Sequence, residues 1–172
     1  KLLLLKIFLG ILLFSFSLFL FASIFSYNQS DPGIGRLVGK TEITNFFGFW
    51  GAISSSILLL LYGKASYLLV VFLMYLSIFF VLGLNLKRPF LKFFLILLSI
   101  ILFNVSLLLQ QNIKIETGLF SKILFDIYKS HFPFLIDNFL YNLLAVASFT
   151  LIAIFLFFYC FSIKIIFFKS VF

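Results

Sequence analysis

The stretch of residues 7–26 contains no charged side chain, and about 20 apolar residues are what a helix needs to cross a bilayer. The whole chain is 64% hydrophobic and only 10% charged, whereas soluble domains are about 45–50% apolar and about 25% charged. A soluble protein of this size needs a polar exterior, so this composition excludes a water-soluble enzyme, a disordered chain and a disulfide scaffold. We therefore expect an all-α, polytopic integral membrane protein.

Four transmembrane helices are predicted, at about residues 7–26, 65–84, 93–109 and 139–161. The first run is longer than the signal-peptide core of about 7–15 residues and lacks a small-residue cleavage pattern, so we interpret it as an uncleaved anchor. Residues 52–84 are too long for one crossing and are interrupted at Gly63 and Lys64. Two interpretations stay open there: two short crossings, or an embedded segment over 52–62, either re-entrant or interfacial, followed by a full span.

The uneven distribution of charge predicts the topology. Lys and Arg concentrate in short cytoplasmic loops, whereas Asp and Glu contribute little to orientation. With four crossings, the cytoplasmic side receives cations and no acid: Lys1, Lys6, Lys87, Arg88, Lys92, Lys164 and Lys169. The outer loops receive all the acids, Asp31, Glu42, Glu116, Asp126 and Asp137, together with Arg36, Lys40, Lys114, Lys122 and Lys129. We therefore expect both termini on the cytoplasmic side.

The second outer loop contains a predicted amphipathic helix that ends before Pro133. Its apolar side consists of Leu119, Phe120, Ile123, Leu124, Ile127 and Tyr128, and its polar side of Ser121, Lys122, Asp126 and Lys129. Such a helix suits the membrane interface, but it could equally pack against its own helical bundle. Short interfacial or embedded helices are therefore expected in the outer loops.

The sequence offers only weak candidates for catalytic or metal-binding residues. Gly39-Lys40-Thr41 resembles the end of a phosphate-binding loop, but Ile34 stands where that motif requires glycine. His131 has no second His or Cys to complete a metal set, and Lys64 is interpreted as a lysine that reaches water from a helix break. Cys160 is interpreted as a small buried hydrophobe. We expect no enzyme activity, no cofactor and no metal site in this chain.

Two blocks of small and polar residues stand out beside the apolar runs. Ser26-Tyr27-Asn28-Gln29-Ser30-Asp31-Pro32 follows the first span and predicts a turn leaving the membrane. The second block begins at Asn45 and continues through Gly48, Gly51 and Ala52 to Gly63 and Tyr67. The small residues 48, 51 and 52 share a helix face and would allow another helix to approach closely. Gly48 and Gly51 are therefore candidate assembly residues, through contacts either inside the chain or with a neighbouring protomer.

Together these blocks resemble the four-span N-terminal domain of FtsK/SpoIIIE-type DNA translocases. That family typically shows S-Y-x-x-x-D-P after its first span, then N-L-G-G-x-x-G-A, and eleven residues further on G-x-x-A-Y. Ser56 stands where many members carry aspartate, and Gly118 is the glycine that remains in the second outer loop. The residues that match the motifs are Ser26, Tyr27, Asp31, Pro32, Asn45, Gly48, Gly51, Ala52, Gly63 and Tyr67.

The resemblance implies a role. Residues 1–172 would form a single membrane-anchor domain of a septal DNA translocase that acts in cell division and chromosome segregation. It would lie in the bacterial inner membrane at the septum, form a homo-oligomer and contact the lipid bilayer and other division proteins. The family's cytoplasmic linker and ATP-driven motor are absent from this chain, so no direct nucleic-acid binding is expected. The only methionine is Met74, which favours a trimmed N-terminus or a piece of a longer protein.

A small polytopic transporter or channel subunit is the alternative function, and a membrane enzyme is less favoured than either. The predicted spans carry no Asp, Glu, Lys, Arg or His at their centres. Transporters and pumps keep such groups along their paths, so their absence favours an anchor. A reading frame that continues into a motor would distinguish the two functions.

Overall fold

The computed structural model describes residues 2–34, 42–84, 86–110 and 116–161, and among them no β-strand forms. The described chain consists of helices joined by short turns and loops. In chain order these are α1 (Leu2–Phe25), α2 (Gly48–Tyr62), the 3₁₀ helix η1 (Gly63–Ala65), α3 (Ser66–Val81), α4 (Pro89–Leu109), α5 (Leu119–His131), α6 (Pro133–Asp137) and α7 (Phe139–Cys160).

Within the described residues, four helical stretches are long and apolar enough to cross a membrane: Leu3–Phe25, Gly48–Val81, Pro89–Leu109 and Phe139–Cys160. The expected all-α polytopic fold is therefore confirmed. One boundary differs in a way that matters below, because α4 begins at Pro89 rather than at residue 93. Proline suits the first turn of a helix, where its missing N–H costs nothing, and Lys92 therefore lies inside α4.

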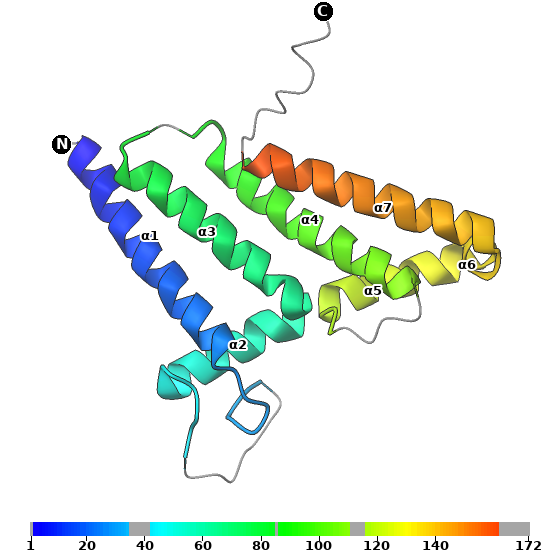
Figure 1. Ribbon diagram of the computed structural model, residues 1–172, viewed down its shortest axis with the longest axis horizontal. Helices are drawn as coiled ribbons and strands as arrows, with labels where there is room; N and C mark the ends of the chain where they lie inside the picture. Colours follow the sequence, from blue (N-terminus) through cyan, green and yellow to red (C-terminus); the bar gives the residue numbers. More distant parts are fainter. Residues whose placement is uncertain (1, 35–41, 85, 111–115, 162–172) are drawn as a thin grey trace, which may run out of the picture.

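The long apolar stretch of residues 48–81 is two helices with different directions. The backbone breaks at Gly63, which has a φ of +64° that side chains with a Cβ rarely adopt. Figure 1 shows α2 lying across the ends of α1 and α3, while α3 alone runs back along α1. This geometry matches the interpretation of a separate segment followed by one full span, and the depth of α2 in the bilayer stays a prediction.

The four long helices form two pairs. α1 packs mainly against α3, and α4 packs mainly against α7 (Figure 1). Small residues bring the first pair together: a Cβ added at Gly10 would lie 2.6 Å from the backbone nitrogen of Val81, which is the close approach that small residues permit between membrane helices. The buried apolar core consists of Leu20, Ile24, Leu69, Val70, Phe72, Leu73, Leu76, Ile96, Ile100 and Cys160.

α5 is the predicted amphipathic helix, and it ends before Pro133 as expected. It packs against the bundle and exposes apolar residues at the same time. Ser121, which we assigned to the polar side, is fully buried because α5 lies against α2 and α4, so that assignment is wrong. The Tyr128 ring packs edge-on against Phe149 of α7 at 5.6 Å, and burial raises the pKa of its phenol. The exposed apolar residues of α5 are Leu119, Phe120, Ile123 and Ile127.

Candidate functional site

The first motif block forms a compact turn where the chain leaves α1. The Asp31 carboxylate is 3% exposed and accepts hydrogen bonds from the backbone N–H of Thr44 at 2.9 Å and from its hydroxyl at 3.0 Å. Thr44 also accepts a hydrogen bond from the Asn28 side chain at 3.1 Å. Hydrogen bonds to a charged acceptor are about twice as strong as neutral ones. Asp31 therefore holds the turn after α1 against the segment that leads into α2.

Asn45 joins the end of α1 to the start of α2. Its side-chain Nδ2 donates to the backbone oxygen of Ser23 at 2.8 Å and to that of Ser26 at 3.4 Å. Its Oδ1 accepts from the backbone N–H of Phe47 at 3.1 Å, and its backbone oxygen accepts from Gly48 at 2.9 Å. The last carbonyls of α1 and the first N–H groups before α2 have no partner within their own helices. The 5%-exposed side chain of Asn45 therefore supplies a partner for the Ser23 carbonyl near the end of α1 and for the N–H of Phe47 just before α2.

Ser26, the residue that follows α1, also takes part in this connection. Its hydroxyl donates to the backbone oxygen of Ala22 at 2.7 Å and accepts from the backbone N–H of Phe46 at 3.0 Å. Asp31, Asn45 and Ser26 therefore fasten the C-terminal end of α1 to the start of α2. We call this set the α1–α2 clasp.

The two candidate assembly glycines have different local roles. Gly48 has a φ of +56°, and a Cβ there would meet nothing within 4 Å. Gly51 lies against the clasp, because a Cβ there would collide with Oδ1 of Asn45 and come within 2.8 Å of Cβ of Phe47. The close approach at Gly51 is thus made inside the chain, next to the fully buried Ala52. A role of these glycines in contacts between protomers stays a prediction.

A second close contact links the α2–α3 corner to the loop before α5. A Cβ at Gly118 would lie 2.5 Å from the backbone nitrogen of Gly63, and the φ of Gly118 is +73°. The backbone N–H of Lys64 donates to the backbone oxygen of Glu116 at 3.0 Å. Asn104 of α4 donates from Nδ2 to the backbone oxygen of Tyr62 at 2.8 Å. Two segments far apart in sequence therefore meet backbone to backbone, and we call this contact the Gly63–Gly118 crossing.

The remaining motif residues border these two contacts. Tyr67 of α3 lies edge-on to Phe21 of α1, with ring centroids 6.0 Å apart. Pro32 follows Asp31 and is half-buried. Tyr27 lines a cavity of about 270 Å³ between the turn after α1, α2 and the start of α5. Ser56 also lines it, and its hydroxyl accepts from the backbone N–H of Ile34 at 3.3 Å.

Sequence reasoning named the clasp residues and both glycines of the crossing, but it missed two residues that bond beside them. Asp31 and Gly63 were identified, but their partners Thr44 and Glu116 were not, and neither residue type has a local pattern that signals a distant partner. Lys92 was also missed, because it was counted as a loop cation. It is 5% exposed, and its Nζ lies 6.0 Å from the ring centroid of Tyr159.

The weaker motifs that lie among the described residues show no catalytic arrangement. His131 ends α5, where its Nδ1 lies 2.9 Å from the backbone oxygen of Ile127. Among the described residues, no group of three His, Cys, Asp or Glu side chains could hold a metal. Lys64 is exposed at the helix break. The phosphate-loop-like Gly39-Lys40-Thr41 lies outside the described residues.

Comparison with known proteins identifies the family. The family described as the 4TM region of DNA translocase FtsK/SpoIIIE matches residues 3–168. No curated protein and no solved structure matches the chain. The match covers almost the whole sequence, including the α1–α2 clasp, the Gly63–Gly118 crossing and the four apolar stretches. The chain is therefore a member of the FtsK/SpoIIIE 4TM family.

Proposed function

We propose that this chain is the membrane anchor and assembly domain of a bacterial septal DNA translocase that acts in cell division and chromosome segregation. The anchor would hold the translocase in the inner membrane at the division septum. Its partners would be the lipid bilayer, further copies of the same chain in a homo-oligomer, and other membrane proteins of the septum. Membership of the family and the four apolar stretches support this proposal.

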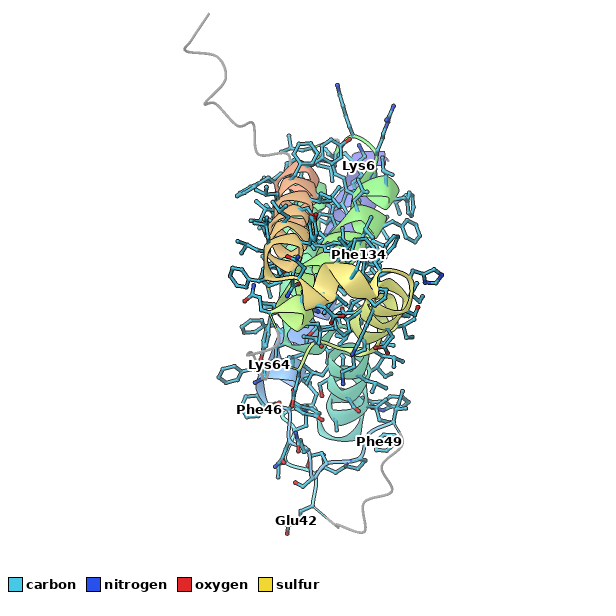
Figure 2. The ribbon with its side chains drawn as sticks, turned by 90° about the vertical axis from the view of Figure 1, so that its right-hand side faces the viewer. Lys6, Glu42, Phe46, Phe49, Lys64 and Phe134 are labelled. Atoms are coloured by element: carbon cyan, nitrogen blue, oxygen red, sulfur yellow. The ribbon has the colours of Figure 1, made fainter. Side chains whose placement is uncertain are left out.

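The proposed orientation in the membrane rests on the separation of charge along the bundle. Lys6 and Glu42 lie at opposite ends of the molecule (Figure 2). Lys87, Arg88 and Lys92 lie where α3 turns into α4, at the same end as the start of α1 (Figure 1). Basic loops stay cytoplasmic, so we propose that this end faces the cytoplasm. All the acids belong to the two connections from α1 to α2 and from α4 to α7: Asp31, Glu42, Glu116, Asp126 and Asp137.

The orientation suits an anchor whose motor is cytoplasmic. α7 ends at the basic end of the bundle (Figure 1), which is where a cytoplasmic linker would attach. We propose that a cytoplasmic motor domain of the full-length protein acts on ATP and DNA. The membrane chain itself would have no enzymatic activity and no cofactor. Lys1, Lys164, Lys169, Arg36, Lys40 and Lys114, which the sequence assigned to the two sides, lie outside the described residues.

Localisation in dividing cells tests this proposal. The chain would be fused at its C-terminus to a fluorescent protein and expressed in a rod-shaped bacterium, with an unrelated four-span membrane protein fused in the same way as the control. We expect enrichment of the chain at the septum and cross-linked species larger than the monomer. Uniform fluorescence around the cell, indistinguishable from the control, together with monomers alone after cross-linking, would contradict the proposal.

A further inference from the structure

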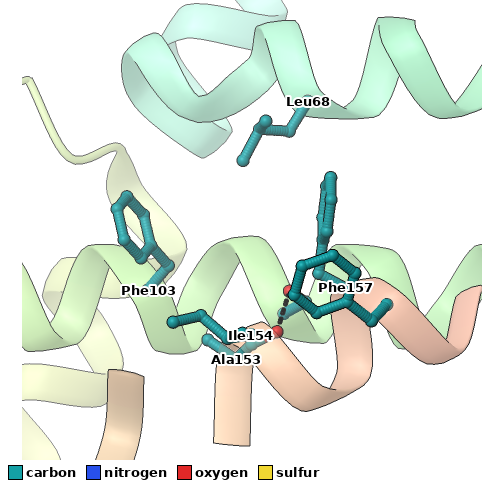
Figure 3. Close-up of a pocket in the computed structure, with 7 residues that line it drawn as sticks. Leu68, Phe103, Ala153, Ile154 and Phe157 are labelled. Atoms are coloured by element: carbon teal, nitrogen blue, oxygen red, sulfur yellow. Dashed lines mark hydrogen bonds between the residues drawn. The ribbon is translucent and has the colours of Figure 1, made fainter. Parts of the chain in front are cut away.

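Two cavities of similar volume differ in the chemistry of their lining. The groove between α3 and the α4–α7 pair has a volume of about 290 Å³, and Leu68 of α3 faces Phe103 of α4 and Phe157 of α7 across it (Figure 3). The hydroxyl of Ser99, which also lines this groove, already donates to the backbone oxygen of Ala153 at 2.8 Å. This groove therefore offers apolar contact, as any lipid-facing surface of the bundle does.

The cavity of about 270 Å³ between the turn after α1, α2 and the start of α5 has a mixed lining. We call it the α2–α5 cavity. Leu59 and Leu60 of α2 and Leu119 of α5 give it apolar surface. Glu116 and Lys122 give it two opposite charges, and both side chains are exposed. A ligand in this cavity can therefore reach a carboxylate, an ammonium group and an apolar surface together.

The part of the lining near the start of α5 suits an anion. The first backbone N–H groups of a helix have no partner inside it and carry a partial positive charge. In α5 the residue before the helix is Gly118, which has no side chain to cap them. Lys122 adds a full positive charge one turn into the helix. Lysine side chains and helix starts both bind phosphate groups.

A buried hydroxyl beside the same helix start lacks a partner. Thr117 lines the cavity and is 1% exposed, and its Oγ1 has no hydrogen-bond partner in the described part of the chain. Buried polar groups in folded proteins are nearly always hydrogen-bonded, so an orphan points to a missing group. A phosphate oxygen at the start of α5 would accept the hydrogen bond that this hydroxyl can donate.

Glu116 gives the cavity a place for a cation. Its backbone oxygen accepts from the backbone N–H of Lys64 at 3.0 Å, which fixes the residue beside the Gly63–Gly118 crossing. Neither Glu116 nor Lys122 forms an ion pair among the described residues. A primary ammonium has three N–H donors for a carboxylate. A ligand that uses both charges therefore carries a phosphate and a primary ammonium.

The size and position of the cavity identify the source of such a ligand. Pockets for drug-sized molecules are about 300–1,000 Å³, so the α2–α5 cavity takes a small polar head and not a whole lipid. Tyr27, which lines it, comes two residues after the apolar stretch that ends at Phe25. A membrane span reaches the headgroup region at such a point. The exposed Leu60 and Leu119 give the attached acyl chains an apolar surface beside the cavity.

We propose that the α2–α5 cavity binds the headgroup of one phosphatidylethanolamine molecule, with its phosphate at Lys122 and the start of α5 and its ammonium at Glu116. The bound headgroup joins the connection between α1 and α2 to the connection between α4 and α5, because both line the cavity. Both faces of a bilayer carry headgroups, so the site is independent of the proposed orientation and of the proposed role in division.

The charge requirement is tested with the delipidated full chain in detergent. Native mass spectrometry would measure binding of dioleoyl phosphatidylethanolamine and of dioleoyl phosphatidylcholine, which has the same net charge but no N–H donor. We expect tighter binding of phosphatidylethanolamine, and equal binding of the two lipids in Glu116→Gln. Lys122→Gln should weaken binding of both lipids about fivefold, the contribution of one cation near a headgroup. Lys129→Gln is the control, because Lys129 is exposed on the same helix but does not line the cavity.

The cavity requirement is tested with a matched pair on α5. Leu119 lines the cavity and is 43% exposed, whereas Ile123, one turn further on, is 47% exposed and does not line it. Leu119→Trp should fill the cavity and weaken binding of both lipids, and Ile123→Trp should not. Circular dichroism would establish that each variant is folded.

Three results would overturn the proposal. The first is equal affinity of the unchanged chain for the two lipids, and the second is full binding of phosphatidylethanolamine by Leu119→Trp. The third concerns the source of the ligand, and free phosphoethanolamine is the probe for it. Because this soluble zwitterion lacks acyl chains, we expect it to displace the lipid only at much higher concentration. Displacement at equal concentration would assign the cavity to a soluble ligand instead of a lipid.

Discussion

The side chain of Asn45 donates a 2.8 Å hydrogen bond to the backbone oxygen of Ser23, and this bond ties the end of α1 to the start of α2. The two residues are far apart in sequence and belong to different structural elements. The same side chain accepts from Phe47 through Oδ1. One amide thus bonds to the last turn of α1 and to the residue before α2, because an amide carries both a donor and an acceptor.

Asn45→Ala should therefore destabilise the protein. It removes hydrogen bonds from buried backbone groups, and leaving such groups without a partner costs about 1–3 kcal/mol. The free energy of unfolding would be measured in mixed micelles by titration with a denaturing detergent. Asn28→Ala is the matched control, because Asn28 is exposed and its hydrogen bonds to Thr44 and Ser30 lie at the surface. A loss in Asn28→Ala as large as that in Asn45→Ala would refute the assigned capping role.

Gly51→Ala should be more costly in the presence of Asn45 than in its absence. The added Cβ displaces Oδ1 of Asn45, although alanine by itself favours a helix over glycine by about 1 kcal/mol. A double-mutant cycle with Asn45→Ala should therefore give a coupling free energy within the range of about 0.5–3 kcal/mol found for residues in contact. Additive effects of the two substitutions would show that Gly51 acts elsewhere, including at a protomer contact.

Gly118→Ala should destabilise the protein more than Gly83→Ala does. Both glycines have positive φ, +73° and +67°, so both variants incur the left-handed penalty of about 1–2 kcal/mol. At Gly118 the new Cβ meets the backbone of Gly63 and Leu61, whereas at Gly83 it meets only the end of the Leu3 side chain. Thermal unfolding in detergent would compare them. Equal melting temperatures would mean that the Gly63–Gly118 crossing is looser than the structure shows.

The purified chain should neither hydrolyse ATP nor bind duplex DNA with high affinity. Its basic end carries a few cations close to the bilayer, and juxtamembrane cations of this kind favour anionic lipid headgroups. Fluorescence anisotropy with a labelled duplex would measure DNA binding, and phosphate release would measure hydrolysis. Submicromolar, salt-sensitive binding to the duplex would contradict the assignment of DNA handling to a separate motor.

The spans were predictable because their signal is local. A run of about 20 apolar residues implies a membrane helix whatever lies next to it, and Gly63-Lys64 marked the break between α2 and α3. The buried face of each span was not predictable, because the helices are apolar on all sides. α1 buries Gly10, Ser17 and Ile24 at every seventh position, but leucine and phenylalanine fill the lipid-facing positions as well.

The contacts of the motif residues were not predictable for a different reason. Asp31, Asn45 and Gly63 drew attention by residue type and family pattern, but what each one touches depends on tertiary structure. The Gly63–Gly118 crossing joins loops separated by α3 and α4, and nothing in either loop signals the other. Lys92 was taken for a loop residue because residue type alone does not show that Pro89 starts the helix.

Membrane topology tests the central claim, an anchor with its acidic end outside and its basic end in the cytoplasm. In a Cys160→Ala background, single cysteines would replace Glu42, Lys129 and Lys87, all of which are exposed, and intact cells would be treated with an impermeant maleimide. We predict that the cysteines at positions 42 and 129 are labelled in intact cells, and that the one at position 87 is labelled only after permeabilisation. Labelling of position 87 in intact cells, or protection of position 42, would contradict the account.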